Sequence, residues 1–367
     1  MSTATIEERG AVASTAETMK AFVMEGLGKV SLVEKRVPRI GPGDALVRTT
    51  AALLCASDVH AVGGALGVRH NLTLGHEAVG RIEKLGSAVQ GLRVGQRVTA
   101  GAVTPCWRCE NCQRGYPSHC GRVLGGWKFG NVKDGNLAEF FQVNDAEANL
   151  CPIPDTIPYE AAVYTCDVMS TGLAGAENAA IPAGGTVAVF GLGSVGLMAT
   201  AFARLLGAGL VIGVDSVPAR QALARRYGAD EIVDFRKAGP VEAVRRLTDE
   251  RGVDSAIEAA GAAESFANCV KVTRPGGTIS NVGYHGYGDS VAIPSLEWGA
   301  GMADQTIRTS LCPGGRVRME RLLRLIEAKR LDPTAMTTHR FAFSEIEKAY
   351  HLMATRADGI VKALIVF

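Results

Sequence analysis

Four cysteines lie close together in the stretch PCWRCENCQRGYPSHC, residues 105–120, at Cys106, Cys109, Cys112 and Cys120. The spacing C-x2-C-x2-C-x7-C lets four thiolates close on one tetrahedral zinc ion. A closed site leaves no position for a substrate, so we expect this segment, the four-cysteine lobe, to be a structural clasp. An iron–sulfur cluster is the alternative for the same thiolates.

A metal ion that does chemistry keeps an open position, which suits ligands drawn from separate loops. Cys55 in LLCASDVH, His76 in LGHEAVG and Asp167 in YTCDVMSTG offer such side chains in three distant places. Each has a plain alternative, since a buried cysteine is usually a small hydrophobic residue and a lone histidine usually a core residue. Glu77, next to His76, is either a fourth or transient ligand or the charge partner of an arginine.

A glycine-rich loop follows the apolar run TVAVF and opens an amphipathic segment. It carries the pattern G-x-G-x-x-G over Gly191, Gly193, Ser194, Val195 and Gly196. In this context the glycines permit a tight turn, and the helix N-terminus offers free N–H groups to a pyrophosphate. The loop therefore predicts a dinucleotide site, the alternative being a glycine-rich turn without a ligand.

The second strand of this region ends at Asp215, in VIGVDSVPAR. An acidic residue at this point accepts hydrogen bonds from the ribose hydroxyls and repels a 2′-phosphate, which favours NAD over NADP. Val217 offers no positive charge, although Arg220 is near enough in sequence to reach a phosphate. Asp215 can also cap the helix that starts near Pro218, and the two roles are compatible.

The elements that position these residues follow two patterns. Strands are expected at TVAVF, LVIGVD, EIVDF, VDSAIEAAG, TISNVG and QTIRTSLC, with helices between them. Apolar strands separated by amphipathic helices predict an α/β Rossmann fold with a doubly wound parallel sheet. Segment 19–150 has short Val-rich strands and frequent turns, which predict an antiparallel, partly barrel-like β domain. The final strand, IVKALIVF, is expected to join the sheet of that domain.

Length and composition set the broad class. The 367 residues allow two domains, and 47% hydrophobic with 21% charged residues indicates a soluble globular protein. The net charge of +2, without a basic stripe, gives no reason to expect nucleic acid or a membrane as partner. Residues 1–18 are expected to form a flexible tail and not a secretory signal. The nine cysteines are then expected to be reduced, in a cytoplasmic protein.

The order of C-x-S-D-x-H, GHEAVG, the four-cysteine lobe and G-x-G-x-x-G resembles that of the zinc-dependent medium-chain alcohol dehydrogenases. RHNLTLGHEAVG, GWKFGNVKDG, FQVNDAEANL, LEWGAGMADQTI and LCPGGRVRMERL further resemble the bacterial tetrameric secondary-alcohol dehydrogenases, and the resemblance spans residues 19–367. It implies a GroES-like, partly barrel-like catalytic domain (19–170 and 313–367) into which a Rossmann domain (171–312) is inserted. It also implies a homotetramer.

The resemblance assigns roles position by position. The catalytic zinc ligands fall on Cys55, His76 and Asp167, with Glu77 as an adjacent acid that sometimes binds the metal. Many relatives have a cysteine as third ligand, which makes Cys166 a rival, but alignment on the shared S-T-G at 170–172 selects Asp167.

The same resemblance makes Ser57 the group that accepts the proton of the alcohol, and His60 the group that passes it toward solvent. The alternative is a local turn in which Ser57 and Asp58 bond the backbone. Tyr284 matches a position near the nicotinamide. The substrate pocket is expected to involve Leu66, Ala102, Trp127, Leu311 and Cys312, each of which could equally be ordinary core.

The chain departs from those relatives in two respects. They prefer NADP and carry Gly-Ser-Arg where this chain has Asp215, Ser216 and Val217, and they commonly lack the four-cysteine lobe. We therefore predict an NAD-dependent dehydrogenase with a catalytic and a structural zinc ion, which interconverts a secondary alcohol and a ketone. The alternatives are a primary-alcohol or polyol dehydrogenase, a metal-free quinone reductase, or a non-catalytic NAD-binding protein.

Overall fold

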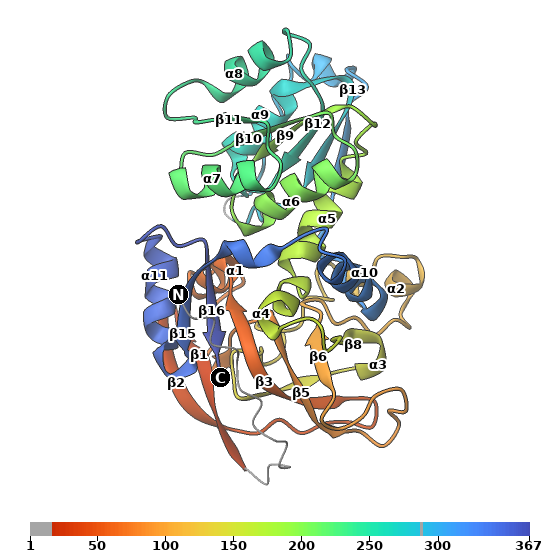
Figure 1. The fold of residues 1–367 in the computed structure, drawn as a ribbon, viewed down its shortest axis with the longest axis vertical. Coiled ribbons are helices and arrows are strands. Elements are labelled where there is room, and N and C mark those ends of the chain that lie inside the picture. The colour runs from red at the N-terminus through yellow and green to blue at the C-terminus, as the bar shows by residue number, and fades with distance from the viewer. Residues whose placement is uncertain (1–16, 287–288) are drawn as a thin grey trace.

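The computed structural model describes residues 17–286 and 289–367. The predicted tail therefore lies outside the described residues up to residue 16, and its last residue, Thr18, already opens the first strand. Two parts of the chain are stacked along the long axis of the molecule, and one helix, α5 (Val168–Asn178), lies between them (Figure 1).

The N-terminal half of the chain is mostly strand. The strands are β1 (Thr18–Gly26), β2 (Lys29–Arg36), β3 (Ala45–Leu54), β4 (Leu72–Thr73), β5 (Ala78–Leu85), β6 (Arg97–Ala100), β7 (Phe140–Val143) and β8 (Leu150–Pro152). Short helices interrupt them: α1 (Ala56–Val62), α2 (Glu110–Gln113), α3 (Ala146–Asn149) and α4 (Tyr159–Ala162), with the 3-10 turns η1 (Pro117–His119) and η2 (Val163–Thr165). All neighbours among these strands are antiparallel, as the short Val-rich runs predict.

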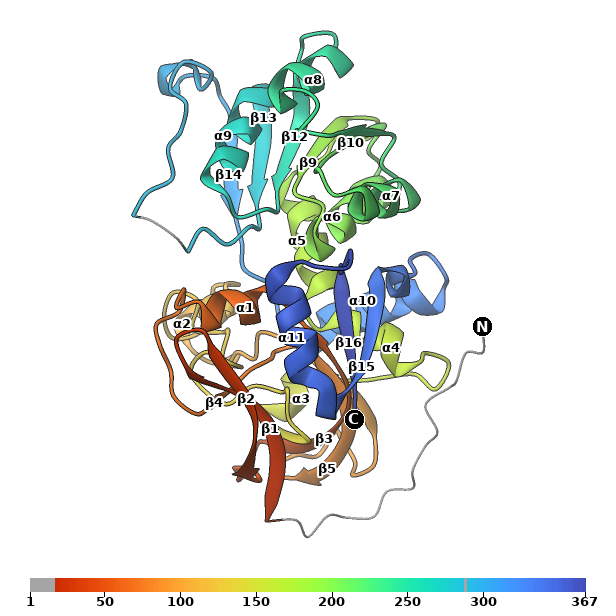
Figure 2. The same ribbon diagram turned by 90° about the vertical axis from the view of Figure 1, so that its left-hand side faces the viewer.

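The end of the chain returns to this sheet. It contributes α10 (Arg316–Glu327), β15 (Thr337–Ala342), α11 (Ile346–Thr355) and β16 (Lys362–Val366). Strand β16 pairs antiparallel with β3, with Leu364 opposite Leu53, so the sheet order is β15-β16-β3-β5-β6-β8. This confirms the expected host of the last strand, and Figure 2 shows α11, β15 and β16 beside the strands of the N-terminal part. The sequence patterns missed β15, a parallel neighbour of β16.

The second part is a six-stranded sheet in the order β11-β10-β9-β12-β13-β14. Its strands are β9 (Thr186–Phe190), β10 (Leu210–Val214), β11 (Glu231–Val233), β12 (Val253–Glu258), β13 (Thr273–Asn281) and β14 (Thr306–Thr309), and every neighbouring pair is parallel. Helices α6 (Ser194–Leu205), α7 (Pro218–Arg226), α8 (Pro240–Leu247) and α9 (Ala263–Val272) connect the strands. All six predicted strands are thus present, although β11, β12 and β14 are shorter than expected and β13 begins earlier.

This strand order is that of the doubly wound dinucleotide-binding sheet, so the predicted Rossmann fold is confirmed. The order reverses beside β9, where the first connection turns to one side and later ones to the other. Ligands of such sheets bind outside the carboxyl ends of the strands at the reversal point. The fold therefore places the glycine-rich loop, which follows β9, at the expected ligand edge. Among the described helices, none is long and apolar enough to cross a membrane.

Candidate active site

Four potential metal ligands meet beside the end of β3. The donor atoms of Cys55, His76, Glu77 and Asp167 all lie within 4.8 Å of one another. Cys55 caps α1, His76 and Glu77 precede β5, and Asp167 is the N-cap of α5, so three separate segments supply the group. His76 Nε2 lies 3.4 Å from Asp167 Oδ2, and both side chains are largely buried.

The group brings negative charge together at a largely buried position, with His76 and Glu77 buried and Cys55 and Asp167 partly buried. Burial opposes protonation of His76, but hydrogen bonds with Asp167, Asp58 and Cys55 outweigh it and raise the pKa well above its ordinary value. Burial also favours neutral Asp167, but the hydrogen bond with His76 outweighs it and lowers the pKa to about 2. A thiol, an imidazole and two carboxyl groups placed together are the donor set that zinc takes in proteins.

Glu77 is held by a residue that sequence reasoning missed. Lys362, in β16, donates from Nζ to Glu77 Oε1 at 2.6 Å, so the charge partner is a lysine and not the arginine considered as one alternative. Within the described part of the chain, Glu77 Oε2 is buried without a hydrogen-bond partner. A buried, unpartnered carboxylate oxygen is costly unless a cation occupies the site. The orphaned oxygen and the donor set therefore fit a metal ion.

Asp58 is the acidic residue of C-x-S-D-x-H, and it makes the local backbone bond that the alternative interpretation expected, together with a bond to a second loop. Its two oxygens accept from the backbone N–H of Cys55 at 2.9 Å and of Gly75 at 3.0 Å, and so tie the two ligand loops together. The Asp58 side chain is 4% exposed. The available signal was position, because an acidic residue three places after a helix N-cap completes a capping box.

The rivalry between Cys166 and Asp167 has a clear geometric outcome. Asp167 points to His76 and accepts from Thr171 Oγ1 at 2.5 Å. Cys166 points elsewhere, with Sγ 3.2 Å from Thr99 Oγ1 and 3.5 Å from the carbonyl of Ala78. Burial raises the pKa of the Cys166 thiol to about 12, so this cysteine is a neutral core residue.

The two proposed proton carriers lie on α1. Ser57 Oγ is 3.3 Å from His76 Nε2, so its hydroxyl borders the metal-ligand group. His60, one turn further on, lines the cleft described below. Burial and the positive charge of Arg356 lower the pKa of His60, which keeps this imidazole neutral at neutral pH.

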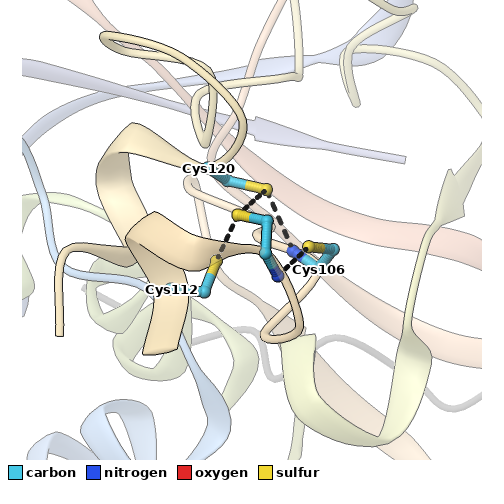
Figure 3. A group of neighbouring side chains, drawn as sticks. Cys106, Cys112 and Cys120 are labelled. Carbon is cyan, nitrogen blue, oxygen red and sulfur yellow. Dashed lines mark hydrogen bonds between the residues drawn. The ribbon is translucent and has the colours of Figure 1, made fainter. Parts of the chain in front are cut away.

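The four-cysteine lobe brings its sulfur atoms together, as Figure 3 shows. The thiols of Cys106, Cys109, Cys112 and Cys120 lie within 4.8 Å of one another, apart from the first group in sequence and structure. Backbone N–H groups point at the sulfurs, for example Gly121 N to Cys109 Sγ at 3.3 Å. Backbone hydrogen bonds with Cys112 and Gly121 lower the pKa of Cys109 to about 6. Burial instead raises the pKa of Cys112 to about 12 and that of Cys120 above its ordinary value, so the N–H groups favour the zinc-binding thiolate form at Cys109 but not at every one of the four sulfurs.

A cleft of about 680 Å³ separates the parallel sheet from α1 and α11. Five of the eight predicted cofactor residues line it: Gly191, Gly193, Ser194, Asp215 and Arg220. Gly196 has another role, since a Cβ there would lie 1.8 Å from the Gly191 carbonyl oxygen and prevent the close approach of α6. Val195 and Tyr284 are not among the lining residues; Tyr284 donates to the carbonyl of Ala65 at 3.0 Å.

Asp215 sits at the edge of this cleft with 5% of its surface exposed. Its oxygens accept from the backbone N–H of Leu192 at 2.9 Å and of Val217 at 2.8 Å, and Arg220 Nη1 is 3.7 Å away. Each carboxylate oxygen has two lone pairs, so Asp215 can brace the loop and still accept from a ribose. Counting only described residues, Arg220 Nε and Ser265 Oγ are buried donors without partners, which fits a polar ligand.

All five predicted pocket residues lie together. With Val103 they form one apolar group, here called the pocket cluster: Leu66, Ala102, Val103, Trp127, Leu311 and Cys312. The Trp127 ring meets the His76 ring edge-on, with 5.9 Å between centroids, so the cluster borders the metal-ligand group. Burial and the nearby Asp167 carboxylate raise the pKa of the Cys312 thiol well above its ordinary value.

Known proteins resemble this chain over nearly its whole length. Residues 41–155 match the alcohol dehydrogenase GroES-like domain, and residues 194–328 match the zinc-binding dehydrogenase family. The NADP-dependent isopropanol dehydrogenase of Thermoanaerobacter brockii is 51% identical over 351 residues, which cover 95% of this chain and 99% of that one. An alcohol dehydrogenase of Cupriavidus necator is 45% identical over 361 residues, with 95% and 98% covered.

Solved structures agree with these matches. An alcohol dehydrogenase from Thermus sp. ATN1 has a TM-score of 0.85 at 32% identity and covers 95% of this chain and 99% of its own. The zinc-dependent alcohol dehydrogenase 2 of Streptococcus pneumonia has a TM-score of 0.86 at 31% identity, with 95% and 98% covered. With its GroES-like part, its parallel dinucleotide-binding sheet and these relatives, the chain belongs to the zinc-dependent alcohol dehydrogenases, which use a nicotinamide cofactor.

Proposed function

We propose that this protein interconverts secondary alcohols and ketones, with zinc held by Cys55, His76 and Asp167. The observation that carries the proposal is the meeting of these donors from three segments, beside both the cofactor cleft and the pocket cluster. Glu77 Oε1 is paired with Lys362. Its other oxygen, Oε2, has no hydrogen-bond partner among the described residues, and Glu77 is near enough to the other donors to serve as a further zinc ligand.

The zinc ion, when bound, supplies a Lewis acid that makes the alcohol hydroxyl more acidic. Ser57 is well placed to accept the hydroxyl proton, because its Oγ borders His76. His60 is neutral and lines the cleft, so it can take the proton onward from the buried side toward solvent. Asp58 keeps the Cys55 and His76 loops in register during these transfers.

The bound nicotinamide supplies the hydride acceptor. Gly191, Gly193 and Ser194 form the edge of the cleft where α6 begins, and the free N–H groups of this helix end suit the pyrophosphate. Arg220 and Ser265 contribute the unpartnered donors noted above, in positions suited to the polar groups of a nucleotide.

A small secondary alcohol is the substrate class that we propose. The support is twofold: relatives from Thermoanaerobacter brockii and Clostridium beijerinckii are among those named as isopropanol dehydrogenases, and the pocket cluster is apolar with small members such as Ala102 and Cys312. The apolar side chains of this cluster suit the two alkyl arms of a secondary alcohol, and the buried Trp127 indole N–H beside them has no hydrogen-bond partner among the described residues.

For the cofactor we propose NAD, although these relatives are named NADP-dependent. The support is Asp215, whose buried negative charge lies on the cleft where the adenosine ribose is expected. A 2′-phosphate at this point would meet a carboxylate, and Arg220 is already 3.7 Å from that carboxylate as its partner.

We propose a structural zinc ion in the four-cysteine lobe. Four convergent thiols leave no open position, so this ion would hold the lobe and take no part in the reaction. The homotetramer and the cytoplasmic location that the family resemblance implies remain predictions.

The test is a substrate and cofactor screen on the purified protein with its metal content measured. Propan-2-ol, a primary alcohol and a polyol are each offered with NAD and with NADP. We expect oxidation of propan-2-ol to be fastest with NAD, and both metal sites to contain zinc. Preference for a primary alcohol or polyol would overturn the substrate class, and preference for NADP would overturn the role of Asp215. Full activity in a zinc-free protein would overturn the proposal that Cys55, His76 and Asp167 hold a zinc ion needed for the reaction.

A further inference from the structure

The four-cysteine lobe is connected to the segment that leaves the parallel sheet. Ser118, in η1 and two residues before Cys120, donates from Oγ to the carbonyl oxygens of Cys312 at 3.0 Å and of Leu311 at 3.3 Å. Ser118 is 7% exposed, so little water reaches these groups. The hydroxyl is thus the polar link between the lobe and residues 310–315, which run from β14 to α10.

This segment forms one wall of the pocket cluster, through Leu311 and Cys312. It is anchored on its other side as well, since Ser170 Oγ donates to the carbonyl of Pro313 at 2.8 Å. Ser170 lies on α5, which Asp167 caps. The Leu311–Cys312 wall is therefore hydrogen-bonded on one side to α5, whose N-cap is the proposed zinc ligand Asp167, and on the other side to the lobe.

The lobe also holds the opposite wall. The carbonyl of Ser118 accepts from the N–H of Gly126 at 3.0 Å, directly before Trp127, and the carbonyl of Gly126 accepts from Thr104 N at 2.9 Å. Thr104 follows Ala102 and Val103, two further members of the pocket cluster. One residue thus bonds both walls, with its side chain on one and its backbone on the other.

The lobe also contacts residues 310–315 at a second point, through Trp107. A Cβ added to Gly315 would lie 2.5 Å from the ring of Trp107, which belongs to the lobe, and Gly315 has a φ of 104° that other residues rarely adopt. A shift of the lobe would therefore move residues 310–315 directly, because no space remains between them.

We propose that Ser118 is a positioning residue, through which the four-cysteine lobe sets the distance between the Trp127 wall and the Leu311–Cys312 wall and so determines which alcohols fit. This inference rests on the proposed function for the identity of the pocket. It gives the lobe a role in substrate selection in addition to holding its own loop.

The experiment compares wild type, Ser118→Ala, Ser118→Thr and the control Gln113→Ala, an exposed residue of the same lobe. We expect Ser118→Ala to keep both zinc ions, its affinity for the cofactor and its kcat. Its KM for propan-2-ol should rise about fivefold, the factor given by the loss of one hydrogen bond of about 1 kcal/mol. Backbone amides of residues 310–315 should exchange with deuterium faster. Ser118→Thr should have the wild-type KM for propan-2-ol and the wild-type exchange rate of residues 310–315. Gln113→Ala should match wild type in both quantities.

Unchanged KM and unchanged exchange in a metal-replete Ser118→Ala protein would overturn the inference. Loss of the lobe zinc from that variant would do so too, because Ser118 would then act within the lobe. A wild type inactive on every alcohol would instead contradict the proposed function, and the exchange measurement would still decide whether Ser118 holds the segment.

Discussion

Lys362 Nζ lies 2.6 Å from Glu77 Oε1, with the two side chains 1% and 0% exposed. Burial disfavours the charged lysine, but the nearby Cys55 and Glu77 outweigh it and raise the pKa of Lys362 above its ordinary value. The last strand of the chain therefore places a fixed positive charge beside the proposed catalytic metal ligands, and neutralises the acid that adjoins them.

Replacing this lysine should destabilise the protein. Lys362→Met leaves Glu77 as a buried charge without its partner, and breaking such pairs costs about 3–5 kcal/mol. Equilibrium unfolding in urea measures the loss. The double variant with Glu77→Gln should recover part of it, because the uncompensated charge is then absent. Equal stability of wild type and Lys362→Met would show that the pair is not a source of stability.

Asp167 and the adjacent Cys166 form a matched pair for the metal site. Asp167→Ala should lose the catalytic zinc and slow alcohol oxidation at least about a thousandfold, since Lewis-acid stabilisation is worth several kcal/mol. Cys166→Ala, which alters a neutral core thiol, should keep its zinc and most of its activity. Metal analysis and steady-state rates report both effects. The opposite pattern would make Cys166 the ligand.

The titration of His60 should depend on Arg356. Burial and the Arg356 charge both lower the pKa of His60 below its usual 6.5, so the ring stays neutral as the pH falls to that value. Arg356→Asn removes the charge and suits the left-handed backbone at φ 52°. The pKa of His60 should then rise. Proton NMR of the histidine rings, assigned with His60→Gln, measures it, and Arg251→Gln on the distant surface is the control. An unchanged or lower pKa in Arg356→Asn would contradict the expectation.

Asp215 should be the residue that makes the protein prefer NAD to NADP. Asp215→Asn keeps an acceptor for the backbone of the glycine-rich loop but removes the charge that repels a 2′-phosphate. We expect KM for NADP to fall and KM for NAD to rise, each by about tenfold, the effect of roughly 1.4 kcal/mol. Steady-state kinetics with each cofactor give the ratio. If the ratio is the same in variant and wild type, another residue selects the cofactor.

Removing one thiol of the four-cysteine lobe should release only the structural zinc. Cys109→Ser is expected to lose this ion, keep the catalytic one and unfold at a temperature ~3 °C lower, since a loss of about 2 kcal/mol is divided by an unfolding entropy of roughly 2.1 cal/mol/K per residue over the 367 residues. Calorimetry with metal analysis measures both. A variant without lobe zinc but with unchanged thermal stability would contradict the role of the lobe as a clasp.

Much of this architecture is predictable from local patterns. The six parallel strands and the helices between them are visible because apolar runs and amphipathic periods depend on nearby residues alone. The thiols of the four-cysteine lobe share one short segment, so their spacing predicts their meeting. The glycine-rich loop is recognisable for the same reason, since strand, turn and helix follow directly in the chain.

Contacts between distant segments are visible only in the folded molecule. No spacing shows that Lys362 reaches Glu77, that Asp58 joins two ligand loops, or that Ser118 holds the carbonyls of Leu311 and Cys312. Strand β15 was missed because its partly exposed, partly polar residues show little alternation of apolar and polar side chains. It is a strand because it pairs with β16, a contact that its own sequence does not reveal. The fold class and the chemical types of the ligands are predictable before the fold is known, because they follow from local periodicity and side-chain identity. The geometry of the site depended on long-range packing, in which a residue acquires its partner only when the sheets have formed.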